Sequence, residues 1–174
     1  MKARFACSVL ALLLGACASV PSQQPLPQPT AVPSAFELTG RLAVRQSDRS
    51  EIARLRWVHR AGSDLWVVSS PLGNEVARIE SDARGARLTQ AGGEPRTAAS
   101  FAALTQGLLG VALEPAQLAT WVHGGEAAGV PSDWTVVIDE KQPAGAIQIA
   151  RRISATRSDV VVRLVVDDYR ALGD

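Results

Sequence analysis

Apolar and polar residues alternate along most of the chain from Phe36 onward. A period of two is the pattern of strands that bury one face and leave the other in water. Turn residues separate the runs, as at 61–64, 71–74 and 82–85. The predicted strands lie at residues 36–45, 53–60, 65–70, 75–81, 86–90, 134–140, 146–153 and 159–167. The sequence therefore predicts a meander of antiparallel strands with one interruption.

The first half of the interruption predicts a short helix. Phe101, Leu104 and Leu108 recur at helical spacing, which places them on one face of the helix. Either Thr97 or Ser100 is the expected N-cap, because a hydroxyl oxygen there accepts from the first backbone N–H groups. The expected end of the helix is the first glycine after Leu108.

The second half predicts another short helix. Pro115 suits its first turn, and Gly124 with Gly125 ends it. Its apolar face consists of Leu118, Trp121 and Val122. Helices of this length are not stable alone in water, so both are expected to pack on the sheet. The predicted fold class is therefore mainly β (α+β).

The chain begins with Lys2 and Arg4 followed by an apolar run at 5–14. This run is too short to cross a hydrocarbon core of about 30 Å, so it predicts a secretory signal peptide. It ends in Leu-Gly-Ala-Cys, which resembles the processing site of bacterial lipoproteins. We therefore expect a signal peptide at 1–16 and a mature chain that begins at Cys17. The alternative is an ordinary secreted domain with a coincidental cysteine at the cleavage site.

The covalent groups expected on Cys17 are an N-acyl chain and an S-diacylglycerol, and several acyl chains together anchor a protein stably. Residues 18–35 are mostly Pro, Gln, Ser, Ala and Val and cannot form a core, so 17–35 is expected to be a lipidated, proline-rich tether. Residues 36–174 are the expected folded domain. Cys17 is the only cysteine of the mature chain, which excludes an internal disulfide and a cysteine-based metal site.

Charge argues against nucleic acid as a partner. Loss of Lys2 and Arg4 with the signal peptide leaves 16 basic and 17 acidic residues, a formal charge of −1. Polar groups that suggest catalysis are also few. His59 and His123 end predicted elements and have no catalytic or metal-binding pattern around them, and His123 is expected to interact with the dipole of its helix. We therefore expect neither an enzyme nor a metal site.

Several short motifs occur in the same order and spacing as in a known family. They are Gly-Arg-Leu-Ala-Val at 40–44, Leu-Arg-Trp at 55–57, Ser-Pro-Leu-Gly at 70–73, the helix segment 118–121, Trp-Thr-Val-Val at 134–137 and Arg-Leu-Val-Val-Asp at 163–167. Together with the lipoprotein signal and the tether, they resemble the outer-membrane lipoprotein receptor LolB family over residues 36–169. The chain differs from many relatives in its short, glycine-rich segment at 124–133, where a strand or part of a lid is expected to be missing. Tyr169 also replaces a usual tryptophan.

The resemblance implies a strongly curved, unclosed, barrel-like antiparallel sheet that wraps short helices around an apolar cavity. It also implies a receptor that accepts lipoproteins from the periplasmic carrier LolA and inserts them into the inner leaflet of the outer membrane without ATP. Its partners would be LolA, the acyl chains of the cargo and outer-membrane phospholipid. We expect a monomer without cofactors, anchored by lipid to the outer membrane of a Gram-negative bacterium and facing the periplasm. Alternatives are a carrier-like or lipocalin-like lipid-binding module, or a structural partner of an outer-membrane machine.

A cavity for acyl chains needs an apolar lining, and each buried methylene contributes about 0.8 kcal/mol. The sequence offers candidates at the apolar positions of the predicted strands and helices. These are Leu42, Val44, Leu55, Trp57, Leu65, Val67, Ile79, Leu88, Phe101, Leu104, Leu108, Leu118, Trp121, Trp134, Val136, Ile147 and Ile149. Periodicity alone does not distinguish a lined cavity from an ordinary filled core. Only the family resemblance favours the cavity.

The turn at 70–73 gives a sharper expectation. Pro71 suits the second position of a tight turn and Gly73 the fourth, which places Leu72 at the tip. A leucine at a turn tip either folds back onto the core or projects into water. The family resemblance implies that Leu72 projects and is required to place cargo into the membrane.

Overall fold

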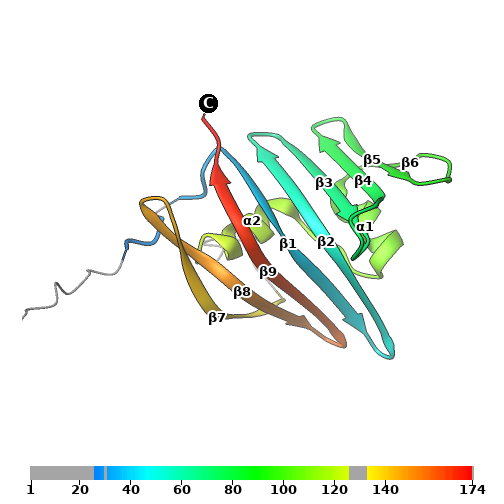
Figure 1. Ribbon diagram of the computed structural model, residues 1–174. Coiled ribbons are helices and arrows are strands. Elements are labelled where there is room, and N and C mark those ends of the chain that lie inside the picture. The colour runs from blue at the N-terminus through cyan, green and yellow to red at the C-terminus, as the bar shows by residue number, and fades with distance from the viewer. Residues whose placement is uncertain (1–25, 30, 126–132, 174) are drawn as a thin grey trace, which may run out of the picture.

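The computed structural model describes residues 26–29, 31–125 and 133–173. Within these residues the chain forms one antiparallel sheet and two short helices (Figure 1). The elements are β1 (Ala35–Gln46), β2 (Arg49–Arg60), β3 (Ser63–Ser69), β4 (Glu75–Asp82), β5 (Gly85–Gln90), β6 (Arg96–Ala98), α1 (Phe101–Leu109), α2 (Pro115–Val122), β7 (Thr135–Ala144), β8 (Ile147–Arg157) and β9 (Val160–Ala171).

The strand order across the sheet is β6-β5-β4-β3-β2-β1-β9-β8-β7. The first five strands form the predicted meander, β6 extends it by one strand, and the last strand returns to pair with β1. The sheet is unclosed, because β6 and β7 lie at its two edges. Both helices lie on one face of the sheet (Figure 1), with α1 against β4, β5 and β6 and α2 against β8. This confirms the predicted mainly β, curved and unclosed architecture.

The strand β6 is the one described element that the sequence did not predict. It is three residues long and pairs only with β5. Three residues are too few to show an alternation, so β6 depends on the neighbouring strand rather than on its own pattern. Thr97 belongs to β6 and pairs with Arg87, which excludes it as the N-cap of α1.

The ends of α1 follow local chemistry. Ser100 is the N-cap, and its hydroxyl oxygen accepts from the Ala103 N–H at 3.1 Å. Gly110 is the C-cap at φ 72°, and its N–H donates to the Gln106 carbonyl. α2 begins with Pro115 in its first turn, as predicted, and its C-cap is His123. Residues 126–132, which include most of the short segment expected to lack a strand or lid, lie outside the described residues.

The apolar core lies between the inner face of the sheet, which is the face that carries the helices, and α1 and α2. Alternate residues of β1, such as Phe36, Leu38 and Val44, are buried there. Buried residues of β2, β8, β9 and both helices belong to the same hydrophobic cluster. The opposite face, here called the outer face, carries mostly charged and partly exposed side chains such as Arg41 and Arg54. The period of two in the sequence thus describes the two faces of the sheet.

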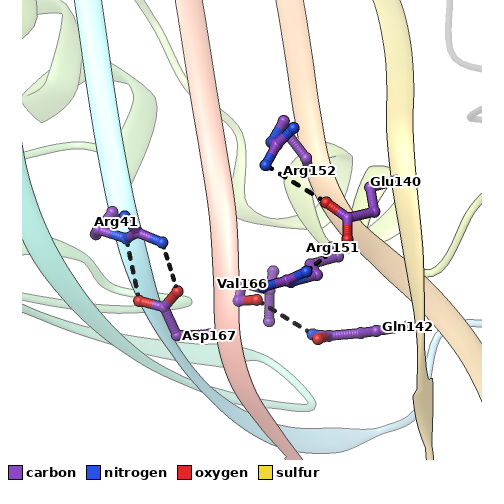
Figure 2. Close-up of polar contacts among 7 residues, drawn as sticks. All are labelled: Arg41, Glu140, Gln142, Arg151, Arg152, Val166 and Asp167. Carbon is purple, nitrogen blue, oxygen red and sulfur yellow. Dashed lines mark hydrogen bonds and ion pairs between the residues drawn. The ribbon is translucent and has the colours of Figure 1, made fainter.

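A bulge interrupts the pairing of β1 with β9. Thr39 pairs with Asp168 but the next residue, Gly40, pairs with Val166, so Asp167 is the extra residue. Figure 2 shows the side chain of Asp167 paired with Arg41 through two hydrogen bonds, of 2.8 and 3.2 Å. The bulged residue Asp167 therefore links β9 to β1 by an ion pair with Arg41 on the outer face.

The segment before β1 is in contact with the domain. The carbonyl of Pro27 accepts from the Gln148 N–H on β8 at 3.0 Å, and Val32 packs against the hydrophobic cluster. The expected tether at 17–35 therefore contacts the fold at Pro27 and Val32. Strand β1 begins one residue earlier than expected, at Ala35. Cys17 lies outside the described residues.

Candidate functional site: the apolar interior and the Leu72 turn

Most of the candidate lining residues face the interior between sheet and helices. Fifteen of the seventeen candidates belong to the hydrophobic cluster or pack against it. The buried ones are Leu42, Val44, Leu55, Trp57, Ile79, Leu88, Phe101, Leu104, Leu118, Trp121, Trp134 and Ile149, and the partly buried ones are Leu108, Val136 and Ile147. The structure thus brings them into one hydrophobic cluster. Their binding of acyl chains stays a prediction.

Two candidates, Leu65 and Val67, are wrong as interior residues. Neither belongs to the hydrophobic cluster, and both lie on the outer face. Val67 pairs with Arg56 and Arg78, and Leu65 lines an outer groove of about 620 Å³. The run 65–68 is apolar at every position, so its sequence did not show which residues face inward.

The residue that sequence reasoning missed on β3 is Trp66. It is buried and pairs with Trp57 on β2, whose ring centroid lies 5.5 Å away. Its ring also meets Phe101 at the start of α1, edge to face at 4.8 Å. Trp66 faces inward because it pairs with Trp57, which also faces inward. The orientation of Trp66 therefore follows from the register of β3 against β2 and not from the sequence of β3 alone.

All the tryptophans of the chain lie in the interior. Trp57 and Trp66 lie on the meander strands, and Trp121 on α2 meets Trp134, before β7, at 5.7 Å. The guanidinium of Arg157 lies 4.7 Å from the centre of the Trp134 ring, within range of a cation–π contact. Aromatic side chains thus line both halves of the interior, and ligand entry there would change their surroundings.

A polar contact joins the end of α2 to the last strand. The Nδ1 of His123 lies 2.7 Å from the Ala119 carbonyl, and its Nε2 lies 2.8 Å from the Tyr169 hydroxyl. Burial raises the pKa of Tyr169 to about 12, so its hydroxyl stays protonated and donates to Nε2. The Nδ1–H then donates to Ala119. Tyr169 therefore holds the end of α2 against the sheet by a hydrogen bond.

His123 is neutral at pH 7 rather than charged. Burial lowers its pKa from the ordinary value of 6.5, and the nearby His59 lowers it further. The Ala119 carbonyl acts in the opposite direction, but burial is the largest cause. The expected interaction of His123 with the end of its helix is therefore a hydrogen bond from a neutral ring to the Ala119 carbonyl. The rings of His59 and His123 both contact Phe36, with ring centroids at 4.9 and 5.1 Å.

The lowered pKa of His123 predicts an acid-sensitive fold. The unfolded chain takes up a proton near pH 6.5 while the folded chain does not, so the free energy of unfolding falls as the pH drops from 7.5 to 5.5. In His123→Phe, the part of this pH dependence that comes from His123 should disappear. The variant should also be less stable at every pH, because the Tyr169 hydroxyl loses its hydrogen-bond acceptor. Urea unfolding at several pH values measures both effects. An unchanged slope in the variant would assign the acid sensitivity to another group.

The predicted turn after β3 is present. The Gly73 N–H donates to the Ser70 carbonyl at 2.9 Å, and the Ser70 N–H donates to the Asn74 carbonyl at 2.8 Å. Gly73 has φ 92°, which a residue with a side chain rarely adopts. Leu72 lies at the tip and is 90% exposed. A large apolar side chain is thus held in water on a turn that is fixed at both ends.

Other kinds of site are not found in the described part of the chain. No group of three or more His, Cys, Asp or Glu side chains lies close enough together there to hold a metal ion. No helix among the same residues has the length and apolar character needed to cross a bilayer.

A family model described as "Outer membrane lipoprotein LolB" matches residues 34–169. The chain belongs to the LolB family. The outer-membrane lipoprotein LolB of Thiobacillus denitrificans is 35% identical over 180 residues, covering 93% of this chain and 94% of the relative. The LolB of an Azoarcus species is 29% identical over 185 residues, covering 98% of this chain and 95% of the relative.

Membership of the LolB family gives the location and the general role. The protein is a lipoprotein anchored in the outer membrane of a Gram-negative bacterium, and it acts in the localisation of lipoproteins.

A solved structure of a DUF1329 family protein from Desulfovibrio piger resembles the fold, with a TM-score of 0.55 and 8% identity. It covers 83% of this chain and 89% of its own, and at this identity it supports the fold alone.

Proposed function

We propose that the protein receives lipoproteins from the periplasmic carrier LolA and inserts them into the inner leaflet of the outer membrane without ATP. The observation that carries this proposal is Leu72, a large apolar side chain that is 90% exposed on a fixed turn. Water disfavours such a side chain, whereas the interfacial region of a bilayer accommodates it. A turn of this kind suits a protein that repeatedly touches a membrane to release its cargo.

The interior is the proposed site for the acyl chains of the cargo. It lies between α1, α2 and the inner face of the sheet, and its side chains form one apolar cluster. Transfer needs no covalent chemistry. Because each buried methylene contributes about 0.8 kcal/mol, small differences in burial between carrier, receptor and bilayer give the direction. Cys17 would keep the receptor at its membrane, and the proline-rich segment after it would let the domain reach an arriving carrier.

Tryptophan fluorescence tests where the acyl chains bind. All four tryptophans of the chain are buried in the interior, so they report on its contents. A lipoprotein whose acyl chains carry bromine should quench their emission, because bromine quenches only at close contact. The same cargo without bromine is the control. Bound cargo without bromine-dependent quenching would place the acyl chains outside the interior.

A transfer assay separates the proposed receptor from its alternatives. The protein is mixed with LolA that carries a labelled lipoprotein, in the absence of ATP, and vesicles are then added. A receptor removes the label from LolA and passes it to the vesicles. A lipid-binding module takes up free lipid but leaves the label on LolA, and a structural partner of another machine does neither. Either of these last two results would contradict the proposal.

A further inference from the structure

A groove of about 560 Å³ lies on the outer face of the sheet, beside the Leu72 turn. Its lining includes Arg41, Arg54, Arg56, Ser69, Gly73 and Asp167. The register explains why these residues meet. Arg54 on β2 lies between Arg41 on β1 and Ser69 on β3, and the turn follows Ser69 directly. The groove is thus separate from the apolar interior and shares its border with the turn.

Three of the groove residues are arginines, and they differ in their partners. Arg41 is paired with Asp167 at 2.8 Å, and Arg56 with Glu37 at 2.6 Å. Glu37 is shared with Arg170, also at 2.6 Å. Among the described residues, Arg54 has no ion pair. The groove therefore presents one free guanidinium between two paired ones, next to the turn.

Exposed apolar side chains lie on the same part of the sheet. Ile52 precedes Arg54 by two residues on β2, which places both on the outer face, and it is 67% exposed. Val76 follows the turn at the start of β4 and is also exposed. Ile52 and Val76 thus share the outer face with Arg54, and the exposed Leu72 lies on the turn that borders the groove. A cation among exposed apolar residues matches the chemistry of a bilayer interface.

We propose that this groove binds the phosphate of an anionic phospholipid headgroup, with Arg54 as its main ligand, when Leu72 enters the bilayer. The guanidinium of arginine offers a planar fork of N–H donors that matches two phosphate oxygens. Charge complementarity favours a lipid with net negative charge over one whose phosphate is neutralised by choline. The proposal rests on the proposed approach of Leu72 to the membrane, and it adds the lipid that the surface recognises.

Hydrogen exchange tests the groove without any cargo. The complete lipidated protein is reconstituted into nanodiscs of phosphatidylcholine, with or without phosphatidylglycerol, and exchange is followed at residues 52–56 and 69–74. Phosphatidylglycerol should slow exchange in both segments by about fivefold, the factor expected for one arginine at an anionic surface. Arg54→Gln should remove this dependence on lipid charge. The matched control Arg163→Gln changes another exposed arginine of the outer face, outside the groove, and should keep it.

Three other results of the exchange experiment would contradict phospholipid binding at Arg54. A dependence on lipid charge that persists in Arg54→Gln would overturn it, as would equal exchange in both nanodiscs for the unaltered protein. Inorganic phosphate that protects the same segments in phosphatidylcholine nanodiscs as strongly as phosphatidylglycerol does would assign the groove to free phosphate instead. The exchange experiment uses no LolA and no cargo. Its failure is therefore distinguishable from a failure of the proposed receptor function, which the transfer assay measures.

Discussion

Replacement of Leu72 with glutamate is expected to abolish delivery of cargo while cargo binding is kept. Leu72 is 90% exposed, so the folded domain loses no buried contact in the variant. A leucine that enters the interface contributes about 2 to 3 kcal/mol, which corresponds to a fall in delivery of at least about 30-fold when it is lost. The carboxylate adds a penalty in the bilayer. Release of labelled lipoprotein into vesicles measures delivery, and transfer of label from LolA measures binding.

Val137→Glu is the matched control for this experiment. Val137 is also a large apolar residue exposed to water, but it lies on the edge strand β7, away from the turn. Its variant should deliver cargo normally. Normal delivery by Leu72→Glu would refute the role of the turn, and equal loss in both variants would show that any new surface charge disturbs the protein.

Local patterns in the sequence were sufficient for the features that depend on neighbouring residues. The Leu72 turn follows from Pro71 and Gly73, and Ser100 caps its helix through a bond to a residue three positions away. The long strands followed from their alternation. For the turn and the N-cap, the structure has the predicted residues in the predicted positions.

Features that depend on distant residues could not be predicted in this way. The run 65–68 is uniformly apolar, so only its pairing with β2 shows that Trp66 faces inward and Val67 outward. The neutral state of His123 depends on burial by segments far along the chain, among them β9 with Tyr169. The groove at Arg54 also combines β1, β2, β9 and the turn. Such sites exist only once the register is fixed.

Gly40 is the clearest case, and its replacement is expected to destabilise the fold strongly. A Cβ atom at Gly40 would overlap the carbonyl oxygen of Val165, at the bulge where β1 pairs with β9. The obstructing atom belongs to the backbone, so no side chain can rotate away. We expect Gly40→Ala to lower the free energy of unfolding by about 3 kcal/mol, a large share of the stability of a small domain. Urea unfolding followed by tryptophan fluorescence measures it.

Gly107→Ala is the matched control, because the same change there should have the opposite sign. Gly107 lies within α1, and a Cβ atom added to it meets nothing within 4 Å. Alanine favours the helix over glycine by about 1 kcal/mol, so this variant should be more stable. A loss of stability in both variants would point to a general effect of the substitution. A stable Gly40→Ala would show that β1 and β9 can move apart at the bulge. The pairing of the first and last strands within the sheet would then not depend on the close approach at Gly40.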